Sequence, residues 1–236
     1  MAVHGVNAVL ELLRSETPVE RVLLHPGPRT GAIRDLARQR AVPCGPGDRA
    51  ALDRAAGTPA HQGAVALGVR FGWATIEDLE TPDCRGALCL DGVQDPRNLG
   101  AILRSARAAG VGGVVLPQDR SAGITPVVAV ASAGTVFGLR IARVPNLVRA
   151  MAALKAAGYW TIGLAADATV ALWQLEAPPR PALVVGGEGE GLRPLVRRAC
   201  DFEAAIPMAA GVESLNVSVA AGVALFELRR RGAFGP

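Results

Sequence analysis

The stretch LCLDGVQDPRNLGAILRSARAAG at residues 88–110 decides the fold. Its apolar start indicates a buried strand at 87–90, and after Asp-Pro a helical pattern is expected over 99–109, ended by Gly110. A strand that leads directly into a helix is the repeating unit of a parallel sheet covered by helices. In such sheets ligands bind at the carboxyl ends of the strands.

The same alternation runs through the rest of the sequence. After the opening stretch it predicts strands near 113–116, 159–164 and 182–186 and helices near 126–133, 146–157 and 217–231. Before it, the pattern predicts helices near 5–14, 30–40 and 48–56 and strands near 20–24, 42 and 64–70. The fold class expected is therefore α/β throughout.

An acidic stretch divides the chain. Residues 73–83, WATIEDLETPD, hold four acids and no base, whereas the segments on either side have more basic than acidic residues. We predict a small α/β domain at 1–72, an acidic linker at 73–83 and a larger parallel-sheet domain at 84–236.

Arginine supplies almost all of the positive charge, because Lys155 is the only lysine among 25 basic residues. The planar guanidinium suits phosphate, which makes RNA a natural partner. A GC-rich genome would give the same arginine excess. The net charge of +4 does not decide between the two readings.

Several classes of protein are not indicated. The sequence has no run of about 18 apolar residues and no secretion signal, so we expect an unexported, cytoplasmic protein that does not enter a membrane. The four cysteines form no Cys-x-x-Cys pair, and the three histidines lie far in sequence from Cys84 and Cys89. Buried free thiols are therefore expected, and no metal site.

The first run that could carry chemistry is Asp-Pro-Arg-Asn-Leu-Gly-Ala-Ile-Leu-Arg at 95–104. It places Asn98 just before the expected helix and Arg104 on its second turn. Asn98 could cap the helix while Arg104 stays in solvent, or both side chains could face a ligand.

The second run is ALVVGGEGEGL at 182–192, a buried strand that enters a glycine loop. It lacks the glycine spacing of a dinucleotide fingerprint and the lysine of a phosphate-binding loop. Glu188 would also repel a phosphate. A ligand with positive charge, or with hydroxyl and amine donors, fits better, although a plain glycine turn capped by glutamate is the alternative.

The third run is AIPMAAGVESLN at 205–216, a short strand and a loop before the last helix. Ser214 and Asn216 stand at the helix start, where both could act as caps or face a ligand. A serine hydrolase is not indicated, because the Gly-x-Ser-x-Gly elbow is absent.

In this order and spacing, the three runs are similar to the signature of the SpoU (TrmH-like) family, the RNA ribose 2′-O-methyltransferases that use S-adenosylmethionine. The similarity covers residues 84–236 and includes Asp-Arg-Ser-Ala-Gly at 119–123 and Ala-Ser-Ala-Gly at 131–134. His-Gly-Val-Asn-Ala-Val at 4–9 and His-Gln-Gly at 61–63 resemble the accessory RNA-binding domain of the branch that methylates a guanosine of 23S ribosomal RNA.

The resemblance implies more than the periodicity shows. It implies an L30e-like first domain, a SPOUT-type catalytic domain whose parallel sheet ends in a deep trefoil knot, and a homodimer built on the catalytic domains. The apolar last helix is consistent with such an interface, although it could simply cover its own sheet.

The resemblance also implies the site. Backbone groups of Gly186, Ile206 and Leu215 would bind S-adenosylmethionine, with Gly187 and Gly191 shaping the loop. Catalytic-site roles would fall to Asn98, Arg104, Glu188, Ser214 and Asn216, and no metal would be needed. One departure is that PVVAVASAG at 126–134 lacks the basic residue often found there, which puts one phosphate contact in doubt.

Two alternatives stay open at this point. The same chemistry could act on a transfer RNA, or on ribosomal RNA at an antibiotic-binding site. A non-catalytic RNA-binding module would keep the fold but would not bind S-adenosylmethionine.

Overall fold

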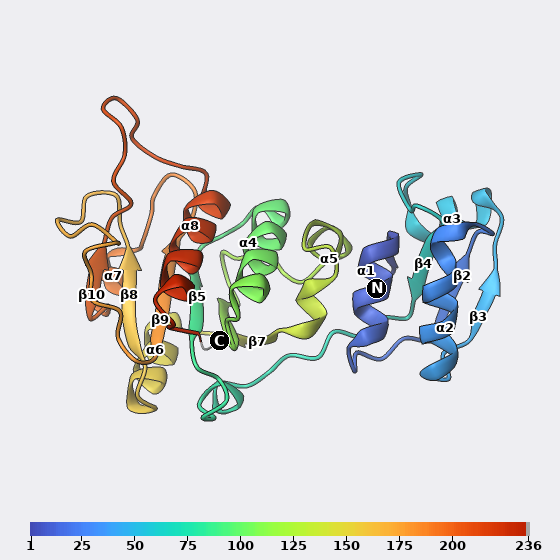
Figure 1. Cartoon of the computed structure of the whole chain (residues 1–236), viewed down its shortest axis with the longest axis horizontal. Helices are drawn as coiled ribbons and strands as arrows, with labels where there is room; N and C mark the ends of the chain where they lie inside the picture. Colours follow the sequence, from blue (N-terminus) through green and yellow to red (C-terminus); the bar gives the residue numbers. More distant parts are fainter. Residues whose placement is uncertain (235–236) are drawn as a thin grey trace. The chain divides into compact units, whose positions relative to one another are not determined.

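The computed structural model describes residues 1–234, apart from the side chain of Pro28. The chain forms two compact units, whose elements are labelled in Figure 1. The first unit contains residues 1–72 and 123–138, and the second contains residues 73–122 and the chain from Leu139 onward.

The first unit is built on a four-stranded sheet in the order β1-β4-β2-β3. β4 runs antiparallel to both of its neighbours, whereas β2 and β3 are parallel. The strands are β1 (Val3–His4), β2 (Arg21–Leu24), β3 (Cys44–Pro46) and β4 (Ala64–Leu67). The helices are α1 (Val6–Arg14), the 3-10 turn η1 (Pro28–Thr30), α2 (Gly31–Gln39) and α3 (Arg49–Ala56). A small α/β unit was expected here, and β1 was not.

Residues 123–138 pack with this first unit, although the sequence suggested that they belong to the larger domain. They form α5 (Pro126–Ala131) and the 3-10 turn η3 (Thr135–Gly138), which contacts α1. Gly134 has φ +85°, and a Cβ built there would lie 2.8 Å from the Ala8 backbone. The close approach to α1 therefore requires glycine at this position.

The second unit has a six-stranded sheet in the order β10-β8-β9-β5-β6-β7, and every pair in it is parallel. The strands are β5 (Ala87–Asp91), β6 (Gly113–Pro117), β7 (Arg140–Val144), β8 (Trp160–Leu164), β9 (Pro181–Gly186) and β10 (Phe202–Ala204). The strand order reverses between β5 and β9. A ligand-binding crevice commonly forms at the carboxyl ends of the strands on either side of such a reversal.

Helices cover both faces of this sheet. They are α4 (Pro96–Ala109), α6 (Leu147–Ala156), α7 (Pro194–Arg198) and α8 (Val217–Arg230). α4 and α8 pack against one another, as Figure 1 shows in green and red. α6 packs on the face that carries Cys89, Val115 and Val184. Because side chains alternate along a strand, their neighbours Leu88 and Val114 point to the opposite face.

The structure corrects several element bounds. α4 begins at Pro96, because Asp95 is the N-cap and accepts a hydrogen bond from the Arg97 amide at 2.8 Å. β7 was missed because exposed Arg140 and Arg143 interrupt its apolar pattern. The short elements α7 and β10 were also missed; the third run was expected to begin with a strand near 205, whereas β10 ends at Ala204.

The acidic linker is held against the second unit. The Ala74 amide donates to the Ile141 carbonyl oxygen at 2.9 Å, so the linker starts as a short extension of the sheet beside β7. Two of its acids have local partners: Asp78 accepts from the Thr75 amide, and Asp83 pairs with Arg140 at 2.5 Å. The Arg140 hydrogen bond lowers the pKa of Asp83 to about 2.

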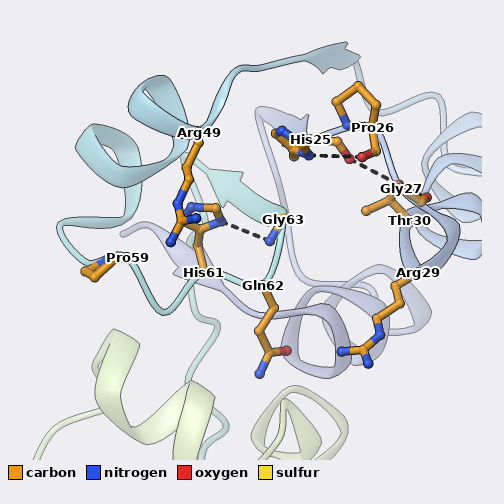
Figure 2. A pocket seen from close by; sticks show the side chains of 10 residues that line it. All are labelled: His25, Pro26, Gly27, Arg29, Thr30, Arg49, Pro59, His61, Gln62 and Gly63. Carbon is orange, nitrogen blue, oxygen red and sulfur yellow. Dashed lines mark hydrogen bonds between the residues drawn. The ribbon is translucent and has the colours of Figure 1, made fainter.

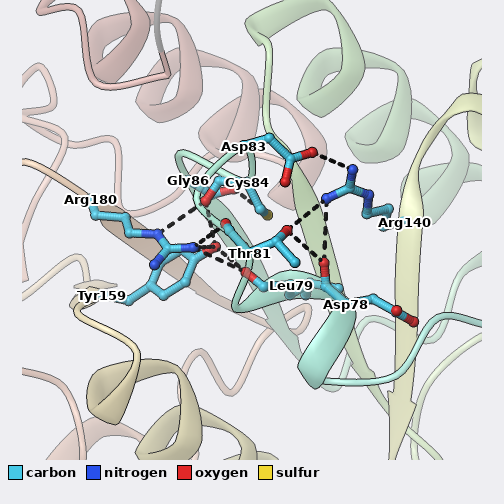
Figure 3. A network of polar contacts seen from close by, with 9 residues as sticks. All are labelled: Asp78, Leu79, Thr81, Asp83, Cys84, Gly86, Arg140, Tyr159 and Arg180. Carbon is cyan, nitrogen blue, oxygen red and sulfur yellow. Dashed lines mark hydrogen bonds and ion pairs between the residues drawn. The ribbon is translucent and has the colours of Figure 1, made fainter.

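Figure 3 shows how Arg180 fastens the end of the linker. Its guanidinium lies 3.9 Å from the centre of the Tyr159 ring and donates to the carbonyl oxygens of Thr81 at 2.7 Å and Cys84 at 3.0 Å. The Tyr159 hydroxyl oxygen lies between two carbonyl oxygens, 2.6 Å from that of Leu79 and 2.7 Å from that of Cys84. Burial raises the Tyr159 pKa, so the phenol stays protonated and can donate.

Arg180→Ala should lower the free energy of unfolding by about 2 to 3 kcal/mol, because several carbonyl oxygens lose a charged donor and the Tyr159 ring loses its cation. Urea denaturation followed by circular dichroism would measure this. Arg85→Ala is the matched control, since Arg85 is exposed nearby. Equal stability of the two variants would contradict the role of Arg180.

The cysteines are all free. Cys84 and Cys89 are buried as expected, whereas Cys44 is exposed and Cys200 is partly exposed. Burial raises the pKa of the Cys89 thiol to about 12. Among residues 1–234, no cluster of three or more His, Cys, Asp or Glu side chains could hold a metal ion. Over the same residues, none of the helices has the length and apolar character needed to cross a membrane.

Candidate active site

A glycine loop leaves the carboxyl end of β9 and folds back on itself. Gly187 and Gly191 form an isolated antiparallel bridge. A Cβ added to Gly186 would lie 2.1 Å from the Gly191 carbonyl carbon, and one added to Gly187 would lie 2.3 Å from the Gly92 carbonyl oxygen. Both close contacts are with backbone, so no side-chain rearrangement could relieve them. The two glycines are required by the shape of the loop.

An ion pair between a buried carboxylate and a partly exposed arginine anchors the far end of this loop. Asp91, at the end of β5 and paired in register with Gly186, accepts from the Arg193 amide at 2.8 Å and from its Nε at 2.6 Å. The Asp91 side chain is fully buried. Sequence reasoning missed this pair. The available signal was a carboxylate that ends an otherwise apolar strand, which implies a buried partner.

The three sequence runs meet in a chain of polar side chains. Asn98 on α4 donates from its Nδ2 to Glu188 Oε1 at 2.7 Å and accepts from Asn216 Nδ2 at 3.2 Å. Asn216 Oδ1 in turn accepts from the backbone amide of Ser218 at 2.9 Å. Asn98 therefore joins the glycine loop to the start of α8, although these residues are far apart in sequence.

The expected capping roles apply only in part. Asn98 does not cap α4, because Asp95 occupies that position and Asn98 lies within the helix. Asn216 is the N-cap of α8 and also donates to Asn98. It therefore caps the helix and belongs to the site at the same time. No cap on α8 from Ser214 is seen in the described chain.

A cavity of about 590 Å³ lies beside these hydrogen-bonded side chains. Its volume is within the size range of small-molecule sites. All five residues expected to bind the donor line it: Gly186, Gly187, Gly191, Ile206 and Leu215. Of the expected catalytic residues, Glu188, Ser214 and Asn216 line it as well. The second and third sequence runs therefore line one and the same pocket at the carboxyl end of β9.

Sequence reasoning missed part of the lining. Leu164 ends β8, the neighbour of β9, and Ala165 and Ala166 follow that strand. Met208, Glu213 and Ala220 come from the third run and α8. If the sequence had shown that β8 lies beside β9, the residues at the end of β8 could have been predicted as lining. The order of the strands was not predicted from the sequence.

Arg104 and Asn98 do not belong to the cavity lining. Arg104 is exposed on the third turn of α4, one turn later than expected because the helix starts earlier. Within residues 1–234 its guanidinium has no hydrogen bond or ion pair. It is therefore available to an external anion, on the helix that also carries Asn98.

The charge of the cavity suits a cationic ligand. Its charged residues are Glu188 and Glu213, and no basic side chain lines it. S-adenosylmethionine carries a positive sulfonium and an amine, together with hydroxyl groups that can use backbone partners. The pocket therefore fits this donor in size, charge and exposed backbone, and it would disfavour a phosphate-bearing dinucleotide.

The parallel sheet, its glycine-lined crevice and the motif residues around it define a methyltransferase. The chain belongs to the SpoU rRNA methylase family, whose model matches residues 86–226. A second model, described as RNA 2′-O ribose methyltransferase substrate binding, matches residues 2–69. These two matches confirm the expected family and the expected α/β fold class, and they support an RNA substrate. The trefoil threading stays a prediction.

Named relatives extend over nearly the whole chain. The 23S rRNA (guanosine-2′-O-)-methyltransferase RlmB of Xanthomonas campestris is 43% identical, with 96% of this chain and 95% of the relative aligned. The protein of the same name from Pseudomonas aeruginosa is 41% identical over 97% of this chain and 96% of its own length. Among solved structures, the SpoU methyltransferase AviRb from Streptomyces viridochromogenes, in complex with the cofactor AdoMet, has a TM-score of 0.83 at 26% identity and covers 100% of this chain and 91% of its own.

Proposed function

We propose that this enzyme transfers a methyl group from S-adenosylmethionine to the ribose 2′-hydroxyl of a guanosine in 23S ribosomal RNA. The observation that carries the proposal is the junction of Asn98, Glu188 and Asn216 beside a cavity with only acidic charges. The relatives of about 40% identity that bear this activity in their names support the choice of substrate.

Backbone groups of Gly186, Ile206 and Leu215 would hold the donor, with Gly187 and Gly191 giving the loop its shape. Bound there, the sulfonium supplies an electrophilic methyl group. Glu188 and Glu213 would favour its positive charge. The Asp91–Arg193 pair would keep the loop fixed, so the cavity need not be organised by the ligand.

The enzyme must also align and deprotonate a weak nucleophile. Arg104 would bind and orient the phosphate of the target nucleotide, because its guanidinium is exposed and has no partner among residues 1–234. The proton of the 2′-hydroxyl would leave through that phosphate or through water. Ser214 would position the ribose. Both ends of the Asn98 amide are occupied by protein groups, so Asn98 would position the ribose less directly, by holding Glu188 and Asn216 in place.

Glu188→Gln tests the charge of the donor cavity. The new amide oxygen can still accept from Asn98, so the loop should hold, but the negative charge is lost. S-adenosylmethionine should bind about 3- to 10-fold more weakly in calorimetry. Glu190→Gln is the matched control, since Glu190 lies on the same loop and lines a different cavity. Unchanged donor affinity in Glu188→Gln would show that the negative charge of Glu188 does not contribute to binding of S-adenosylmethionine.

Mapping of 2′-O-methyl sites tests the proposed substrate. Ribosomal and transfer RNA from cells with and without this protein would be compared by a primer-extension or sequencing assay for ribose methylation. A single guanosine of 23S RNA that loses its mark supports the proposal. A lost mark in transfer RNA, or at an antibiotic-binding site, would select one of the alternative substrates. With a ribosomal RNA target, the enzyme would act in the cytoplasm.

A homodimer through α8 is part of the proposal. Val219, Val223 and Phe226 recur at helical spacing and are exposed by 50%, 39% and 49% of their surfaces, so α8 presents an uncovered apolar face. The opposite face of α8 packs on α4, so packing within the unit leaves the exposed stripe uncovered. A second copy of this chain is the occupant that fits, because an isologous helix pair buries the same stripe twice.

Light scattering at micromolar concentration should give a dimer, and Phe226→Asp should give a folded monomer, because a carboxylate would be buried against an apolar partner face. Val170→Asp, at another exposed apolar side chain of the second unit, is the control and should leave the dimer intact. A wild-type monomer would refute the interface.

A further inference from the structure

A second cavity, of about 370 Å³, lies wholly within the first unit (Figure 2). It is formed by the loops that follow β2 and precede β4, together with the starts of α2 and α3. Its lining holds the two arginines Arg29 and Arg49 and no carboxylate. The cavity beside β9 has two acids and no base, so the two sites select opposite charges.

The two arginines are free to bind. Both are exposed, and within the described residues neither makes an ion pair or a side-chain hydrogen bond. In Figure 2 their side chains come from opposite sides of the view, with Gln62 between them. Asp48, the carboxylate next to Arg49 in sequence, is engaged by the Ala51 amide at 2.7 Å. An anion in the cavity would therefore meet two uncompensated guanidinium groups.

Gln62 is held in one orientation by the protein. Its Oε1 accepts from the Val6 amide at 3.1 Å, at the start of α1. Since the oxygen is fixed there, the amide nitrogen is the end left to face the cavity that Gln62 lines. It has no protein acceptor among residues 1–234. Gln62 also has φ +55°, an uncommon conformation for a residue with a side chain.

His61 fixes the neighbouring backbone. Its ring is buried, its Nδ1 accepts from the Gly63 amide at 2.9 Å, and its Nε2 lies 3.1 Å from Asp53 Oδ1. His61 and Gly63 thereby hold the turn that presents Gln62. The His-Gln-Gly run is thus a rigid support for one donor side chain, which goes beyond an ordinary turn before a strand.

We infer that this cavity binds a nucleotide of the RNA substrate away from the reacting ribose, with Arg29 and Arg49 on its phosphate and the Gln62 amide as a directed donor. The inference rests on RNA being the substrate, as proposed above. The site would anchor the RNA, while the reaction takes place in the second unit. It should affect binding and leave the methyl transfer step unchanged.

The test uses the full-length protein and 23S ribosomal RNA transcribed in vitro. Filter binding would be measured over a salt series without S-adenosylmethionine. Arg29→Ala with Arg49→Ala should weaken binding about tenfold for each arginine and reduce the slope of log affinity against log salt by about one for each lost contact. At saturating RNA, kcat should equal that of the wild type, and S-adenosylmethionine affinity should not change.

Two further variants separate binding from folding. Arg38→Ala removes the same charge from the outer surface of α2, 3.9 Å from Asp35, and should cost less than twofold in affinity. Gln62→Glu keeps an acceptor for the Val6 amide but replaces the free donor with a negative oxygen, so it should weaken RNA binding without lowering the melting temperature. A purely structural Gln62 would tolerate this change.

Wild-type affinity in both the double arginine variant and Gln62→Glu would overturn the inference, as would a loss no larger than that of Arg38→Ala. These outcomes are distinct from failure of the proposed function. If the wild-type protein binds 23S RNA but transfers no methyl group to it, the substrate assignment fails, and the binding measurements still decide whether the cavity contacts RNA.

Discussion

Arg104→Ala is expected to lower kcat for RNA methylation by about 10³-fold or more, because the guanidinium proposed to hold the target phosphate is removed. S-adenosylmethionine affinity should stay within about twofold of the wild-type value, since Arg104 does not line the donor cavity. Single-turnover transfer of a labelled methyl group, with calorimetry of donor binding, would measure both. Because the guanidinium is exposed and has no partner in the described part of the chain, stability should be unchanged.

Arg107→Ala is the matched control for this experiment. Arg107 lies on the same helix, is exposed and carries the same charge. Its loss should weaken RNA binding slightly and leave the rate constant near that of the wild type. Loss of donor binding in Arg104→Ala, with RNA binding intact, would show that the arginine serves the donor and would refute its assignment to the phosphate.

Gly186→Ala should abolish binding of S-adenosylmethionine, with a loss of at least about 100-fold. The added methyl group would lie 2.1 Å from the Gly191 carbonyl carbon and 2.4 Å from the Leu192 amide nitrogen, so the loop must open. Gly186 also lines the donor cavity, and any shift changes its shape. Equilibrium dialysis would measure the donor, and filter binding should show that the variant still holds RNA.

Gly222→Ala provides the control for a glycine replaced within the same unit. A Cβ there meets Ser105 Oγ at 3.6 Å, an ordinary contact, and alanine favours the interior of α8. Donor affinity should be unchanged and stability equal or slightly higher. If Gly186→Ala binds the donor as well as Gly222→Ala does, the loop is not the rigid wall described above.

Much of the fold could be predicted because its signals are local. The apolar run before Asp91, the helix stopped by Gly110 and the run into Gly186 each identify an element from neighbouring residues alone. β7 was missed for the same reason, since its two arginines break the local pattern. Packing of residues 123–138 with the first unit depends on a long-range contact at Gly134, for which the sequence has no periodic signal.

For the site, too, some features could be predicted from the sequence and others could not. The residue types were predictable from the resemblance, and the structure brings Asn98, Glu188 and Asn216 together. Their individual contacts were not predictable: the sequence allowed Asn98 to cap the helix or to face a ligand, and in the structure it bridges two segments. The Asp91–Arg193 pair was also missed, because only the strand pairing of β5 with β9 shows that the two residues meet.

The bridge through Asn98 also bears on when the enzyme becomes active during its own synthesis. Asn98 reaches Asn216, which lies 118 positions later and starts α8. Chains fold from the amino end as they leave the ribosome, so the sheet strands through β9 precede the last wall of the donor cavity. A growing chain that has not passed Asn216 has the arginine on α4 and the glycine loop but no closed pocket. The nascent enzyme therefore cannot modify RNA until its final helix has emerged.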